Sequence, residues 1–316
     1  MNQPKVPLSV VVPVKNEAGS LARCLQSVSW AAEIFVVDSH SSDRTAEIAE
    51  SFGARVYQFD FSGKWPKKKN WALENLPFSF EWVFILDADE VLPPEAEAEI
   101  GAIVSAAPGI AGGDGAQSTS ARGDGSVPGS SSQGLAGYWI NRRFMFMGKW
   151  LRHAYYPNWN LRLFKHKLGR YEKLTDSDTQ SGDNEVHEHV LVDGQTGRLR
   201  VEMDHYSYPS IAEFVEKHNR YSNWEAHVAL EAQSGNVSGK LQMPSVGLRR
   251  KLRILSLRAP LRPLLRFAYI YFWQKGFLDG MEGYYFARLH AVYEFLIIAK
   301  THELRLRARK TLSERD

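Results

Sequence analysis

Short apolar segments alternate with amphipathic segments along the first hundred residues of the chain. Runs of β-branched and aromatic residues predict strands, and leucines that recur every three or four positions predict helices. The predicted strands are 8–14, 33–37, 55–59 and 83–86, and the predicted helices are 20–28, 44–52 and 68–75. This alternation favours right-handed crossovers and an α/β fold, in which helices flank a mostly parallel central sheet.

Polar residues follow three of the predicted strands where each one ends. The segment 15–17 comes after the first strand, Asp38 and a serine-rich turn close the second, and Asp87 and Asp89 close the fourth. The carboxyl ends of parallel strands meet at one edge of a sheet, where α/β proteins bind ligands. Asp38 alone is also typical of a turn or a helix cap, but the three ends together favour a nucleotide site.

The acidic pair Asp87 and Asp89 is the most informative feature of this edge. On an extended strand, the i, i+2 spacing places both carboxylates on one face, where they repel each other unless a cation lies between them. Oxygen ligands of this kind suit Mg²⁺ or Mn²⁺, with a substrate phosphate completing the shell. The alternative is a strand-to-helix turn in which Asp89 caps a helix that begins near Pro93.

Composition and missing motifs narrow the function classes. The chain has 316 residues, a net charge of +3 and one cysteine, which excludes a disulfide framework and a cysteine-built metal site. Cys24 falls on a predicted amphipathic helix, which favours a buried packing role. No Gly-x-Gly-x-x-Gly follows the first strand and no Gly-Lys-Ser/Thr phosphate loop occurs, which argues against dinucleotide dehydrogenases and P-loop ATPases.

Four motifs, taken in order, resemble those of the family 2 glycosyltransferases with the GT-A fold. They are VVVPVKNE at 10–17, VVDSHSSDRT at 36–45, KNWAL at 69–73 and LDADE at 86–90. Within this family the chain is most similar to the lipopolysaccharide-core glucosyltransferase group. The resemblance implies a Rossmann-like GT-A domain that binds a nucleotide-diphosphate sugar, most often a UDP-sugar.

The resemblance also implies roles for individual residues of the donor site. Pro13, Glu17 and Asp38 would contact the nucleoside. Lys69 and Asn70 would lie beside the ribose and the phosphates. The lysine run 67–69 is alternatively typical of a solvated basic turn.

Metal binding is a further expectation from the resemblance. Asp87 and Asp89 would hold Mg²⁺ or Mn²⁺ and the diphosphate, and His205 would add a contact to the metal or the diphosphate. For His205, a structural role beside the neighbouring tyrosines is the alternative. Arg162 also matches a family element, and it would either pair with an acid of the site or support the sheet.

An inverting transfer needs a base on the face of the sugar opposite the leaving group. The segment 184–189 resembles the Val-His-Glu element of this subgroup. By that resemblance Glu188 is the expected catalytic base, and Glu185 is the reserve candidate.

The remaining segments predict the domain organisation. Residues 1–235 are expected to form the catalytic domain, with a Gly/Ser-rich flexible insertion at 106–137. Residues 236–316 are expected to form a basic amphipathic helical region, since 240–275 holds nine Lys or Arg and no acid. Pro260 and Pro263 are expected to divide it into short helices.

The basic region predicts association with an anionic membrane surface, without a spanning helix. A basic subdomain packed on the catalytic domain and nucleic-acid binding are the alternatives, and the second is less favoured. A lipid-linked or lipopolysaccharide acceptor, handled at the inner face of a bacterial inner membrane by a cytoplasmic peripheral enzyme, would explain this region. A sugar-phosphate nucleotidyltransferase and a non-catalytic adaptor remain rival functions, and the donor sugar stays open.

Overall fold

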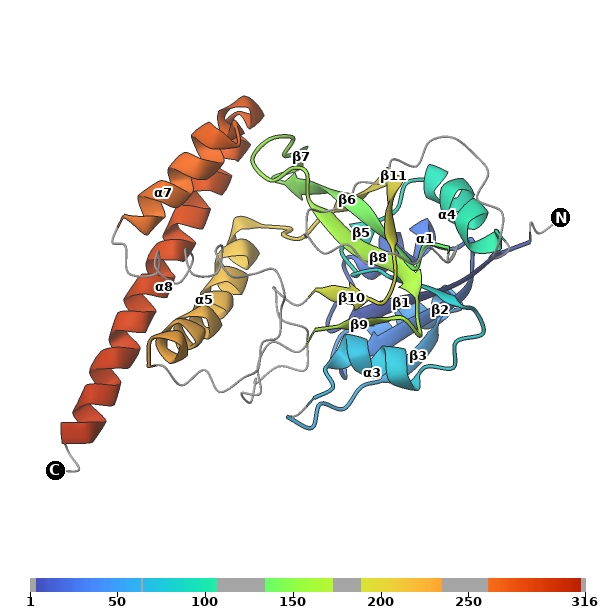
Figure 1. Ribbon diagram of the computed structural model, residues 1–316, viewed down its shortest axis with the longest axis horizontal. Helices are drawn as coiled ribbons and strands as arrows, with labels where there is room; N and C mark the ends of the chain where they lie inside the picture. The colour runs from blue at the N-terminus through green and yellow to red at the C-terminus, as the bar shows by residue number, and fades with distance from the viewer. Residues whose placement is uncertain (1–3, 64, 107–133, 173–188, 235–260, 314–316) are drawn as a thin grey trace, which may run out of the picture. The chain divides into compact units, whose positions relative to one another are not determined.

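The structure is a computed structural model that describes residues 4–63, 65–106, 134–172, 189–234 and 261–313 (Figure 1). The chain divides into two compact units. The sheet unit comprises Met1–Arg143 and Asn158–His205, and the helical unit comprises Phe144–Pro157 and Tyr206–Asp316. The predicted boundary after residue 235 therefore does not coincide with the division between the units, which runs through the sequence at three places.

One half of the main sheet has the predicted parallel arrangement. Its strands lie in the order β3 (Arg55–Gln58), β2 (Ala31–Asp38), β1 (Val6–Val14) and β4 (Trp82–Ile85). β1 pairs in parallel with both β2 and β4, and β2 pairs in parallel with β3. The carboxyl ends of β1, β2 and β4 consequently meet at one edge, as the pattern predicts.

The other half makes the sheet mixed rather than mostly parallel. β4 is followed by β8 (Trp159–Lys165), β6 (Gly137–Phe146), β11 (Thr196–His205) and β5 (Glu90–Val91). β8 is antiparallel to β4 and to β6, and β5 is antiparallel to β11. Antiparallel strands need no crossover helix, and no helix separates β6 from β8 in this fully described stretch. The α/β class is confirmed.

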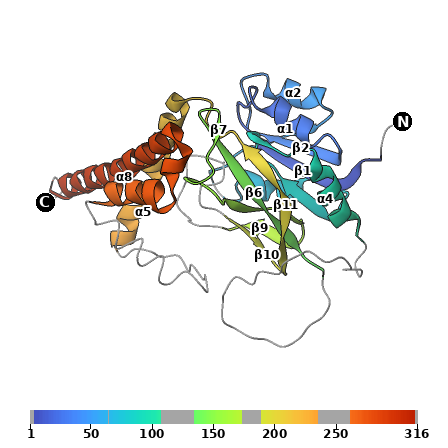
Figure 2. The same ribbon diagram turned by 90° about the horizontal axis from the view of Figure 1, so that it is seen from above.

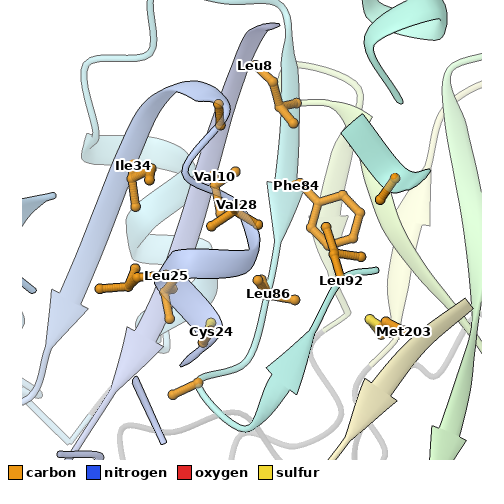
Figure 3. Packing of buried hydrophobic residues seen from close by; sticks show 14 of the residues in the cluster. Leu8, Val10, Cys24, Leu25, Val28, Ile34, Phe84, Leu86, Leu92 and Met203 are labelled. Carbon is orange, nitrogen blue, oxygen red and sulfur yellow. The ribbon is translucent and has the colours of Figure 1, made fainter. Parts of the chain in front are cut away.

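Helices cover both faces of the parallel half. The predicted helices correspond to α1 (Leu21–Ser27), α2 (Thr45–Ser51) and α3 (Lys68–Asn75), and α4 (Glu95–Ser105) follows β5. Leu8, Val10 and Val12 of β1 pack in a core cluster with residues of α1, α2 and α4 (Figure 3). Val11 faces the other side and packs in a cluster with Ala72 of α3. Alternate residues of this buried strand thus pack in two core clusters, one on each face of the sheet.

A two-stranded sheet of β9 (Gly169–Tyr171) and β10 (Val190–Val192) completes the sheet unit (Figure 2). The two strands are antiparallel, and Tyr171 pairs with Val190. Tyr171 and Val190 both pack in the cluster that contains Val11. This small sheet therefore extends the core on the α3 side.

The helical unit contains α5 (Ile211–Ser234), α7 (Arg262–Ala268) and α8 (Met281–Ser313), and β7 (Lys149–Trp150) pairs with the end of β6. A π-helical turn (Tyr269–Trp273) and a 3₁₀ turn (Gly276–Asp279) join α7 to α8. Its core includes Phe146, Phe214 and Phe286. α7 runs beside α8 (Figures 1 and 2).

The expectation for one proline of this region is revised. Pro263 lies in the first turn of α7, where proline is well tolerated, so it begins a helix and does not break one. Pro260 lies outside the described residues. Among the helices in the described ranges, none combines the length and the apolarity that a membrane crossing requires.

Candidate active site

The acidic pair lies in a turn and not on a strand. β4 ends at Ile85, and the N–H of Glu90 donates to the carbonyl of Asp87 at 2.9 Å to close the turn. The prediction that Asp87 and Asp89 share one strand face is therefore wrong, because the backbone turns between them. Asp89 does not cap a helix either, since α4 begins after Pro94 with no side-chain cap.

Asp87 is held by two cationic side chains from different elements. Lys69 Nζ of α3 lies 2.7 Å from Asp87 Oδ1, and Arg162 of β8 lies 2.6 Å from Oδ2. Burial opposes ionisation of Asp87, but Arg162 and Lys69 outweigh it and hold the pKa of the Asp87 carboxyl well below its ordinary value. Each oxygen of Asp87 thus has a cationic partner in this structure, and the metal contact of Asp87 stays a prediction.

The same neighbours affect the cations. Burial alone would lower the pKa of Lys69, but the adjacent Asp87 outweighs it and raises that pKa. Burial is likewise outweighed at Arg162, whose pKa is raised well above its ordinary value by Asp87 and Glu90. Lys67 and Lys68 are buried, and Lys68 Nζ donates to the carbonyl of Val14. The lysine run is thus not a solvated basic turn.

Glu90 is a supporting residue that the sequence analysis did not single out. Its buried carboxylate accepts from the N–H of Asp87 at 2.9 Å, from Arg162 at 2.5 Å and from Arg142 at 3.2 Å. Arg162, with 6% of its side chain exposed, therefore bridges Asp87 and Glu90. Both predicted alternatives for Arg162 are confirmed, because it pairs with acids of the site and braces the sheet.

Asp89 and His205, two of the predicted metal ligands, lie close together. β5 and β11 are paired so that His205 lies opposite Glu90, and His205 Nε2 is 3.5 Å from Asp89 Oδ2. Ligand atoms in adjacent positions of an octahedral shell, about 2.0–2.2 Å from the ion, lie about 2.8–3.1 Å apart, so Asp89 and His205 would have to move closer together to share one ion. No group of three or more possible protein ligands occurs among the residues that the structure describes.

Cys24 lies beside the acidic turn. The thiol is buried on α1 and lies 3.6 Å from the carbonyl of Asp87. Burial raises its pKa well above the ordinary value, and the carboxylates of Glu90, Asp89, Asp87 and Glu17 raise it further. These four acids therefore lie near the Cys24 thiol.

The ends of β1 and β2 are tied together by hydrogen bonds. Asn16 accepts from the N–H of Ser42 at 2.8 Å, and its own N–H donates to Ser41 Oγ at 2.8 Å. Asp38 is buried and accepts from the N–H and the hydroxyl of Ser41 and from the side-chain amide of Gln58. Asp38 therefore stabilises its own turn, and its nucleoside contact stays a prediction.

Glu17 and Pro13 are the predicted nucleoside residues that remain partly exposed. Glu17 accepts from Ser20 Oγ at 2.6 Å, and its N–H donates to Thr45. Pro13 lies in β1 opposite Val37 of β2. Both lie near the carboxyl end of β1, where the predicted donor site begins.

Asn70 is buried and holds the backbone of Tyr171. Its amide nitrogen donates to the carbonyl of Tyr171, and its amide oxygen accepts from the N–H of the same residue, each at 2.9 Å. Lys69 Nζ lies 5.3 Å from the centre of the Tyr171 ring. Asn70 therefore fixes the backbone of β9 at Tyr171, and its contact with a donor stays a prediction.

β9 leads toward the segment with the predicted base. Glu185 and Glu188 lie outside the described residues. His189, at the near end of β10, donates its N–H to Glu172 Oε1 at 3.0 Å, and its Nδ1 lies 2.9 Å from the same oxygen. Glu172 is buried and fixes the position of His189, directly after the expected base.

Comparison with known proteins identifies the family of this domain. Residues 9–107 match the sequence model of Glycosyl transferase family 2. This region carries β1–β4, the acidic turn and Lys69. The chain therefore carries a family 2 glycosyltransferase domain. The α/β sheet unit has the architecture expected of the GT-A fold.

Relatives match along most of the chain. The lipopolysaccharide core biosynthesis glycosyltransferase LpsC of Rhizobium meliloti (strain 1021) is 27% identical over 95% of this chain and 93% of its own length. The uncharacterized glycosyltransferase RT0209 of Rickettsia typhi is 26% identical over 97% of this chain and 90% of its own. The crystal structure of S. aureus TarS has a TM-score of 0.38 and 15% identity, covering 89% of this chain and 54% of that chain.

Proposed function

We propose that this glycosyltransferase moves a sugar from a UDP-sugar donor to a hydroxyl of a lipid-linked glycan such as the lipopolysaccharide core. The resemblance of the chain to glucosyltransferases indicates that the sugar is a hexose. The observation that carries the proposal is the convergence of Lys69, Arg162, Asp89 and His205 at the carboxyl ends of β1 and β4. Cationic side chains next to a carboxylate and an imidazole that can bind a metal ion are suited to stabilising a diphosphate leaving group.

Asp89 and His205 are the residues proposed to hold Mg²⁺ or Mn²⁺. Bound there, the ion would stabilise the negative charge that develops on the departing diphosphate. Asp87 takes a different part in this proposal. It anchors Lys69, whose ammonium is thereby positioned at the edge where the phosphates would bind.

We propose Glu188 as the base that removes the proton of the acceptor hydroxyl, with Glu185 as the reserve candidate. The oxygen of that hydroxyl attacks the anomeric carbon as the bond to the diphosphate breaks, so one displacement inverts the configuration. The resemblance of the segment 184–189 to the Val-His-Glu element supports this assignment. Glu188→Gln should bind the donor like the wild type but lose the transfer activity. His189→Gln should lose less of the transfer activity than Glu188→Gln.

The acceptor class rests on similarity over nearly the whole chain to a lipopolysaccharide core glycosyltransferase. A lipid-linked acceptor implies work at a membrane surface, and we place the enzyme as a peripheral protein on the cytoplasmic face of a bacterial inner membrane. The nucleotidyltransferase and the adaptor are set aside, since the chain is a glycosyltransferase.

Thermal unfolding with UDP and Mn²⁺ tests the donor site. The pair should raise the Tm of the wild type because both bind the folded state. Asp89→Asn and His205→Ala should lose this increase, whereas Asp60→Asn, a change at an exposed carboxylate of the same unit, should keep it. An equal increase in Asp89→Asn would exclude the proposed metal site.

Hydrolysis of a panel of sugar nucleotides by the same protein would identify the donor sugar. Discrimination among hexoses depends on pocket contacts, so the preferred donor should show the highest kcat/KM for slow hydrolysis. Asp89→Asn should abolish hydrolysis of every donor in the panel.

A further inference from the structure

The helical unit carries an exposed apolar tip where α7 joins α8. The tip consists of Phe272, Trp273, Phe277, Leu278 and Met281. Trp273 is 80% exposed and Phe272 is 61% exposed. Side chains of this size are rarely left in water together unless they contact a partner or a membrane.

The backbone of the tip is held firmly. Asp279 is buried, and its carboxylate accepts from the N–H groups of Arg152, His153 and Ala154 at 2.8–3.0 Å. A Cβ at Gly283 would come within 2.0 Å of the carbonyl oxygen of Gly276, so these two backbones are in close contact. The fixed backbone of this turn therefore keeps the apolar side chains at the surface.

The exposed apolar surface continues along α7. Leu261, Leu264 and Leu265 precede and begin this helix at the i, i+3, i+4 spacing of one helical face, and Leu264 is 62% exposed. The opposite side of the α7–tip segment packs inward through Phe267 and Ile270, which contact the core of the unit. We call the three leucines the α7 face. Tip and face together form a surface that the core of the unit does not use.

Few acidic side chains surround this surface. Three acids occur between residues 261 and 302. Asp279 and Glu294 are buried, and Glu282, whose side chain is 28% exposed, pairs with Lys149 at 3.2 Å. Lys275 lies exposed within the tip, between Trp273 and Phe277. Exposed aromatic residues beside a cation are the composition of segments that lie in the interface of anionic membranes.

We infer that the tip and the α7 face insert into the interfacial region of a bilayer that contains anionic phospholipid. The inserted side chains would lie at the level of the acyl chains and Lys275 at the level of the headgroups. A second copy of the chain fits less well, because a two-fold interface through the tip would bring Lys275 near its own copy, and the neighbouring acid Glu282 already pairs with Lys149. The inference does not depend on the identity of the donor or acceptor.

Co-sedimentation of the full chain with lipid vesicles tests the inference. The wild type should bind vesicles of phosphatidylcholine and phosphatidylglycerol in equal parts better than phosphatidylcholine alone. The double variant Phe272→Ser/Trp273→Ser should lower the partition coefficient about tenfold or more, because two large apolar groups no longer leave water. Leu264→Ser/Leu265→Ser should also lower it, and Lys275→Glu should remove the preference for the anionic vesicles.

Phe52→Ser is the matched control, since Phe52 is 40% exposed but lies on the sheet unit, and it should bind like the wild type. All variants should keep the wild-type Tm and the wild-type response to UDP and Mn²⁺, which separates a failure of this inference from a failure of the donor site. Unchanged vesicle binding by the Phe272/Trp273 variant would overturn the inference. So would a lipid-free dimer that this variant dissociates, because the surface would then be a protein interface.

Discussion

Arg162 lies 2.6 Å from Asp87, and the same guanidinium nitrogen lies 2.5 Å from Glu90. Arg162 comes from β8, whereas the two acids come from the turn after β4 and from β5. One buried cation thus joins three elements of the sheet unit and fixes the turn that contains the proposed metal ligand Asp89.

Arg162→Met should destabilise the sheet unit strongly. The variant keeps the volume of the side chain but leaves the buried Glu90 with a reduced set of partners. Breaking a buried pair in this way costs about 3–5 kcal/mol, which chemical denaturation measures as a lower free energy of unfolding. Arg170→Ala, at an exposed position of β9, should change that free energy by no more than about 0.5 kcal/mol. Equal stabilities of the two variants would contradict the bridging role of Arg162.

Asp87 should make stability depend on pH in the acid range. Its pKa is held below the ordinary value of about 3.9, so the folded state favours its ionised form. The stability from this group is fully present above that ordinary value and is lost as the pH falls from there through the pKa of the folded state. The free energy of unfolding of the wild type should therefore exceed that of Asp87→Asn by a constant amount near neutrality.

Below about pH 4 this difference should shrink. Denaturant titrations of both proteins at a series of pH values measure it. Asp60→Asn should show a smaller difference, because Asp60 is exposed and pairs only with the exposed His40. A difference between wild type and Asp87→Asn that stays constant to pH 2 would rule out the proposed ionisation of Asp87.

The fold was predictable in the parallel half of the sheet, where predicted strands and helices alternate along the chain. The helix predicted over 68–75 matches α3, and the first four strands match because each is an apolar run bounded by turn residues. The antiparallel half was not predictable, since an apolar pattern indicates a strand but not its neighbour or direction. The pairing of β4 with β8 joins residues that are about eighty positions apart in the chain.

The site was predictable only in its local parts. The acidic turn was found from its position after a buried strand, but the partner of Asp87 was not, because Arg162 is 75 residues away and reaches it through the register of β8. Asn70 was assigned to the donor from its motif. Its real neighbour, Tyr171, is 101 residues away.

Asn70→Ala should lower stability through the backbone of Tyr171. The substitution leaves a buried N–H and a buried C=O without their amide partner, which costs about 1–3 kcal/mol in the free energy of unfolding. Asn75→Ala, at an exposed position of the same helix, should change it by no more than about 0.5 kcal/mol. If Asn70 bound the ribose directly, Asn70→Ala would instead weaken UDP binding and leave stability unchanged.

Cys24 should be unreactive toward thiol reagents in the folded protein. The thiolate is the reactive form, and burial together with the surrounding carboxylates raises the pKa of this thiol well above its ordinary value. A disulfide reagent that reports released thiolate should therefore label the native protein far more slowly than it labels the protein in guanidinium chloride. Since Cys24 is the single cysteine, no other group contributes to the signal. Labelling of the native protein as fast as of the unfolded chain would mean that α1 does not pack over the acidic turn.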